Sequence, residues 1–169
     1  MKPRRYMFVS AAAAATFAVS FAHAGPIDSP VPLLSGNSAT ALFIIPGITK
    51  NNSIESEVIC TNLDSVSGLV GVEIFDSTGG SPLNNVASGD GEQGVAQGGT
   101  VTIGTGNTVG FHEDEVIAAL PLNVKGGSAR VVSTVRKLAC TAFLLDDTSD
   151  PPVSMVPLKV FAKKRQNGD

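Results

Sequence analysis

The chain has 169 residues, with 12 Lys and Arg against 15 Asp and Glu, and its formal net charge is −3. This length suits one domain of ordinary size. Its acidic balance, without a concentrated basic face, excludes a typical nucleic-acid-binding protein, so we predict no nucleic-acid partner.

Residues 1–24 predict a secretory signal peptide. Residues 2–5 carry three cations, residues 6–21 are apolar, and Ala-His-Ala at residues 22–24 supplies a small-x-small cleavage site. The apolar stretch is short for a membrane span and contains Ser and Thr. Cleavage after Ala24 predicts a secreted, periplasmic or cell-surface protein with no stable membrane insertion.

The predicted mature chain is more acidic than the full sequence. It keeps nine Lys and Arg against fifteen Asp and Glu, a net charge of −6, and it loses the only Tyr. His112 is the one histidine that remains, beside five phenylalanines. The sequence thus predicts three mature segments: an extended, proline-rich leader (25–37), a β-sandwich domain (38–162) and a polar basic tail (163–169).

The first half of the domain alternates between β-type segments and turns. We predict strands over 38–45, ended by Pro46-Gly47, and over 57–62, where Val58 and Cys60 share a face. A third strand places Val70, Val72 and Ile74 on one side and Glu73 on the other. Residues 76–99 are rich in Gly, Asn and Ser and predict the least structured part, with a short strand at most around 83–87.

The second half continues the same pattern. Glycines at 123–128 predict a turn, and Arg136-Lys137 predicts the tip of a hairpin between its two flanking strands. Pro157 indicates an edge position for the final strand, in which we place Val156, Leu158 and Val160 inward. The strands expected here cover residues 100–103, 109–111, 116–120, 129–135, 138–145 and 154–162.

These short strands, separated by turn residues and without a helical period, predict an all-β protein with a single antiparallel β-sandwich. Cys60 and Cys140 lie on two of the strands, and export would place them in an oxidising compartment. We predict a disulfide between them that pins one sheet to the other, worth on the order of 4 kcal/mol. Two buried free thiols are the alternative.

An exported all-β chain with one cysteine in its second strand and one in a late strand resembles immunoglobulin-like sandwiches. The blocks GSARVVSTVRKLACTAFLLDD and DPPVSMVPLKV are similar to segments of uncharacterised secreted bacterial proteins. The resemblance covers residues 38–162 and implies the fold only, since such sandwiches host many roles. The chain has no Trp to pack on the bridge and no Tyr before the second cysteine, as antibody-type domains have.

Motifs of catalysis are absent from the sequence. It contains no G-x-S-x-G, C-x-x-C or H-E-x-x-H, and one mature histidine cannot build a multi-histidine metal site. We interpret His112 as a loop residue beside solvated acids. Gly104-Thr105-Gly106 lacks the lysine and the helix of a phosphate loop, so it is read as a turn.

Two acidic loops are candidates for calcium, because hard cations take oxygen ligands from loops. One contains Asp146, Asp147 and Asp150, and the other contains residues 113–115. Neither has the ligand order of an EF-hand. We favour solvated acidic turns and therefore predict no cofactor, with calcium as the alternative.

Two functions from different classes follow. The first is a non-catalytic exported β-sandwich that acts through protein contacts or self-assembly, as a surface, matrix or adhesion subunit. The second is a secreted enzyme or small-ligand binder whose site the sequence does not show. The final strand can pair within its own chain or with a neighbour's open edge. For this strand we favour pairing within its own chain.

Overall fold

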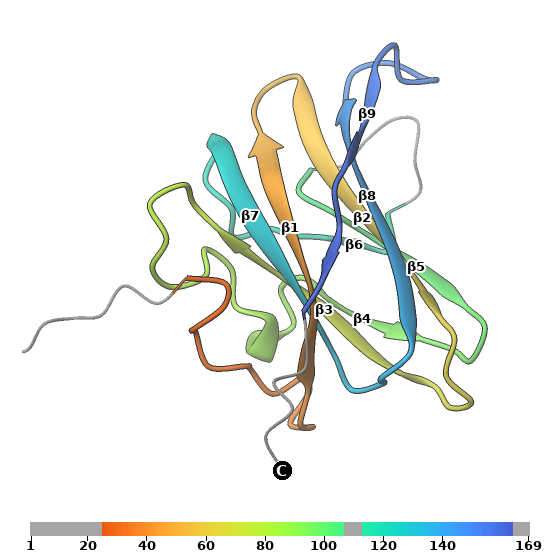
Figure 1. Ribbon diagram of the computed structural model, residues 1–169. Helices are drawn as coiled ribbons and strands as arrows, with labels where there is room; N and C mark the ends of the chain where they lie inside the picture. The colour runs from red at the N-terminus through yellow and green to blue at the C-terminus, as the bar shows by residue number, and fades with distance from the viewer. Residues whose placement is uncertain (1–24, 107–112, 164–169) are drawn as a thin grey trace, which may run out of the picture.

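The computed structural model describes residues 25–106 and 113–163 (Figure 1). Several predicted features lie outside the described residues. They are the signal peptide, the strand over 109–111, His112 and residues 164–169 of the basic tail.

The described chain forms two five-stranded sheets that share one core, which confirms the predicted all-β sandwich. All strand pairings are antiparallel except the one between β5 and β6. The first sheet has the order β10 (Phe161–Ala162), β1 (Thr40–Lys50), β7 (Val124–Ser133), β3 (Gly68–Phe75), β4 (Glu92–Val95). The second has the order β6 (Glu115–Val116), β5 (Thr100–Gly104), β2 (Ile54–Asn62), β8 (Leu138–Asp146), β9 (Met155–Leu158).

The predicted alternation of side chains holds in the central strands. Val70, Val72 and Ile74 of β3 are buried in the core between the sheets, and they meet Val58 and Cys60 of β2 from the other layer. Burial of such apolar rows supplies most of the favourable free energy of folding, at about 25 cal/mol per Å².

Several predicted boundaries are wrong, including the strand expected over 116–120, where only the two-residue β6 forms. β1 continues through Pro46 and Gly47, and register shifts on either side of Ile48 accommodate the interruption. β7 begins at Val124, so the glycines expected to form a turn lie within a strand. The short strand expected around 83–87 is replaced by a 3-10 turn, Val86–Ser88, and β4 forms in the stretch predicted to be least structured. β4 forms through backbone pairing with β3, and its sequence, EQGV, has no apolar alternation that would have predicted a strand.

The predicted hairpin at Arg136-Lys137 is also wrong. β7 pairs with β1 and β3 in the first sheet, whereas β8 pairs with β2 and β9 in the second. The turn therefore carries the chain from one layer to the other. Both strands have an inward apolar row, and these rows face each other across the core instead of lying side by side.

The disulfide between Cys60 and Cys140 is present, with an S–S distance of 2.08 Å. Its predicted position between the two sheets is wrong, because the cysteines are directly opposite each other on β2 and β8 of one sheet. The bond joins neighbouring strands within a layer. Its sequence separation of 80 residues still closes a long loop.

The leader is packed on the outer face of the first sheet. Leu34 is fully buried in a second, smaller core with Ala41, Val86 and Val132. Gly71 makes this packing feasible, since a Cβ at that position would lie 2.9 Å from Leu34 Cδ2. Ser35 adds hydrogen bonds from its backbone N–H and hydroxyl group to the Glu92 carboxylate on β4.

A buried arginine holds the start of the leader. Arg130 on β7 is fully buried, and its Nε donates to Glu73 Oε2 on β3 over 2.6 Å. The rest of its guanidinium donates to the carbonyl oxygens of Pro26 (3.3 Å), Ser29 (2.6 Å) and Pro30 (2.9 Å). The group also stacks over the Phe75 ring, 5.5 Å from its centroid. A planar, five-donor cation suits this convergence of acceptors.

Candidate functional site

The last described residues, 154–163, close one open edge of the sandwich; we call them the closing segment (Figure 1). Its first part, β9, pairs with β8 of the second sheet, and its second part, β10, pairs with β1 of the first. The segment therefore crosses from one layer to the other. It pairs within its own chain, as the edge position of Pro157 indicated.

The two sides of the closing segment differ. Leu158 and Val160 pack against the core as predicted, but Val156 does not point inward. Instead Met155 (45%), Val156 (54%) and Phe161 (45%) are exposed. Three large apolar side chains of this edge are thus exposed to solvent, which is unusual for an edge segment.

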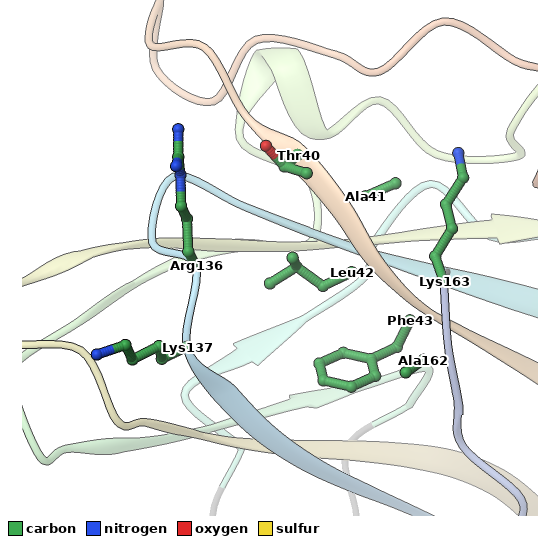
Figure 2. A pocket seen from close by; sticks show the side chains of 8 residues that line it. All are labelled: Thr40, Ala41, Leu42, Phe43, Arg136, Lys137, Ala162 and Lys163. Carbon is green, nitrogen blue, oxygen red and sulfur yellow. The ribbon is translucent and has the colours of Figure 1, made fainter. Parts of the chain in front are cut away.

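An apolar groove of about 480 Å³ lies where the closing segment ends (Figure 2); we call it the terminal groove. Figure 2 shows Leu42 and the Phe43 ring between two sets of cations, with Arg136 and Lys137 on one side and Lys163 on the other. The full lining is Thr40, Ala41, Leu42, Phe43, Arg136, Lys137, Ala162 and Lys163.

One acidic group lies beside the cationic rim. The Asp64 carboxylate accepts the backbone N–H of Arg136 over 3.1 Å and that of Ser65 over 2.9 Å. These hydrogen bonds, together with the charge of Lys137, lower the pKa of Asp64. The charged side chains that line the groove itself are all cationic.

The predicted calcium candidates in the β8–β9 loop are not brought together as ligands. Asp146 Oδ1 accepts the backbone N–H (3.0 Å) and the hydroxyl group (2.6 Å) of Thr148. Hydrogen bonds from Thr148 and Ser149 lower the pKa of Asp146 to about 2, so the carboxylate is ionised at neutral pH. Asp147 is half-buried and Asp150 is exposed. Among the described residues, the three aspartates form no group with converging carboxylates.

A different set of carboxylates does converge. Oxygen atoms of Glu55, Glu57 and Glu113 all lie within 4.8 Å of one another, and the first two residues are buried. Three such carboxylates are chemically able to hold a hard cation. The sequence placed Glu57 on an outer face and Glu113 in a solvated turn, and it missed this convergence. The other members of that predicted acidic turn, Asp114 and Glu115, accept backbone N–H groups instead.

The end of β5 and the two residues after it, Gly104 to Gly106, lie against these glutamates, and glycine makes the close approach feasible. A Cβ at Gly104 would lie 2.5 Å from Glu57 Oε1 and 2.7 Å from the carbonyl oxygen of Gly106. Two glutamates spaced i, i+2 on a strand, opposite a Gly-x-Gly turn, are the one sequence signal that could have indicated their burial.

We expect Gly104→Ala to lower the free energy of unfolding by about 1–3 kcal/mol, because the added methyl group has no room. The measurement is urea denaturation followed by circular dichroism. Gly94→Ala is the matched control, since a Cβ at Gly94 meets nothing within 4 Å. Equal stability of the two variants would contradict the close packing of the turn over the glutamates.

No helix among residues 25–106 and 113–163 has the length and apolar character that a membrane span requires. Comparisons of the chain with protein-family models, with curated proteins and with solved structures find no match. The surface and edges of the chain itself are therefore what bears on its function.

Proposed function

We propose that this chain is an exported, non-catalytic structural subunit that acts through protein contacts, as a surface, matrix or adhesion component. The observation that supports this proposal is the closing segment. It seals both sheets at one edge, yet it presents Met155, Val156 and Phe161 to solvent. Large apolar side chains exposed along the edge of a sheet favour a surface that another protein covers.

Export and fold type belong to the same proposal. The predicted signal peptide supports export, and a disulfide fits an oxidising compartment. Two facing, largely antiparallel sheets support an immunoglobulin-like type. The position of the disulfide within one sheet departs from antibody-type domains, whose bridge joins the two sheets.

The second candidate is a secreted enzyme or small-ligand binder. The convergence of Glu55, Glu57 and Glu113 is the observation that favours it, because paired carboxylates perform acid–base chemistry and bind cations. The closing segment supports the first candidate more directly, because its apolar side chains are exposed to a partner, whereas Glu55 and Glu57 are buried.

We expect residues 25–169, purified with the disulfide intact, to show a mass in solution that rises with concentration in sedimentation and light scattering. The double variant Val156→Ser/Phe161→Ser should associate more weakly, since it removes exposed apolar side chains without touching the core. A chain that stays monomeric from micromolar to millimolar concentration, and binds no envelope or matrix component, would contradict the proposal and favour the second candidate.

A further inference from the structure

Two chemically opposite features lie at opposite ends of the sandwich. β8 has nine residues, Leu138–Asp146, and Lys137 on the rim of the terminal groove directly precedes it. The β8–β9 loop directly follows it. A strand of this length separates the two features by roughly 30 Å. Figure 1 shows the loop between β8 and β9 at one end of the molecule and the turn between β7 and β8 at the other.

The terminal groove is suited to an extended segment with acidic and apolar side chains. Its floor contains Leu42 and Phe43, and its rim carries Arg136, Lys137 and Lys163. On β1, the register with β10 covers only Phe43 and Ile44, and Lys163 N–H then bonds the Leu42 carbonyl oxygen. Next to the groove, the β1 edge before Leu42 is not paired with β10.

The β8–β9 loop has the complementary composition. Residues 146–153 contain three aspartates and no cation, and they end in Pro151, Pro152 and Val153. Asp146, the last residue of β8, is buried, so the acidic groups of the loop itself are Asp147 and Asp150. Val153 is 83% exposed, so this apolar side chain has almost no cover in its own chain. Asp150 is exposed beside it. Two prolines also limit the entropy that such a segment would lose on binding.

We propose that the partner of this protein is a second copy of the same chain, whose loop 146–153 docks in the terminal groove. This inference depends on the proposed function and adds a contact that is separate from the exposed side chains of the closing segment. Val153 covers the apolar floor, the exposed Asp150 faces the cationic rim, and the half-buried Asp147 adds its negative charge beside it. In a chain predicted to carry a net charge of −6, three cations around one groove select an acidic segment.

Because the groove and the loop are different surfaces, the contact is heterologous. Each copy that docks its loop leaves its own groove open for the next copy. Contacts of this kind form a ring if the rotation closes and an open filament if it does not. The positions of the two features at opposite ends of the sandwich favour a linear, head-to-tail arrangement.

The test reverses the charges on each side separately. Arg136→Glu/Lys137→Glu makes the groove acidic, and Asp147→Lys/Asp150→Lys makes the loop basic. Each variant alone should associate at least tenfold more weakly than the parent chain, that is, with about a tenfold or larger rise in Kd. An equal mixture of the two should recover association, because every groove then meets a loop of opposite charge.

Two further measurements keep the test independent of folding, and a third checks its electrostatic basis. Each variant is first compared with the parent by circular dichroism and thermal melting. Val153→Ser, a single change at an exposed side chain, should also weaken association without a change in melting temperature. Association of the parent should decrease as salt is added, since the charged rim is exposed.

Several outcomes would overturn the inference. Charge variants that associate like the parent would leave the proposed function standing and remove loop docking. Loss of association by the groove variant without recovery in the mixture would indicate that the groove binds another acidic segment of this chain instead of loop 146–153. Ile44→Cys/Phe161→Cys, placed on the β1–β10 pair, would give covalent dimers if copies exchanged closing segments instead. A parent chain that stays monomeric overturns the inference, and it contradicts the proposed function as well only if the chain also binds no envelope or matrix component.

Discussion

Replacement of Arg130 by methionine should lower the free energy of unfolding by about 3–5 kcal/mol, because it leaves Glu73 buried without its cationic partner. The Arg130 Nε to Glu73 Oε2 distance is 2.6 Å, and both side chains are almost completely buried. The same change removes the donors that bind the leader's carbonyl oxygens. Urea denaturation of residues 25–169 measures the effect.

The double variant Arg130→Met/Glu73→Leu separates the ion pair from the leader. It should recover part of the lost stability, since no charge remains buried alone. The leader should stay loosened in both variants, and limited proteolysis should cut within 25–37 faster than in the parent. A leader as resistant as in the parent would show that Leu34, and not Arg130, holds it in place.

Removal of the disulfide by Cys60→Ala/Cys140→Ala should lower the free energy of unfolding by about 4 kcal/mol. The bond closes a loop with a sequence separation of 80 residues, which restricts the unfolded chain. It joins β2 to β8, and the pairing of these two strands connects the β6-β5 side of the second sheet to β9. The midpoint of urea denaturation, with the slope compared between variants, measures the change.

The parent protein should contain no alkylatable thiol until a reductant is added, and reduction should shift its denaturation midpoint by as much as the double substitution does. Alkylation of both cysteines without reductant would contradict the disulfide. Equal stability of the parent and the double variant would instead show that β2 and β8 hold their register without it.

Local alternation determined much of the fold. Val70, Val72 and Ile74 were assigned to the core because strand side chains alternate, and that property needs no knowledge of the partner strand. The two cysteines also predicted their own pairing, since the chain contains only two. Pro157 indicated an edge because proline cannot donate to a ladder, and β9 is an edge strand.

The tertiary structure alone decided what covers each outer face. Alternation placed Arg130, Glu73 and Glu57 opposite the core, but it could not show that the leader binds Arg130 or that Gly104 lies against Glu57. It also could not assign β7 and β8 to different sheets, because two apolar rows can meet side by side or across a core. Those choices depend on contacts between residues distant in sequence, including Arg130 with Ser29 and Lys163 with Leu42. The terminal groove and the cover of the buried glutamates exist only once these long-range contacts have formed.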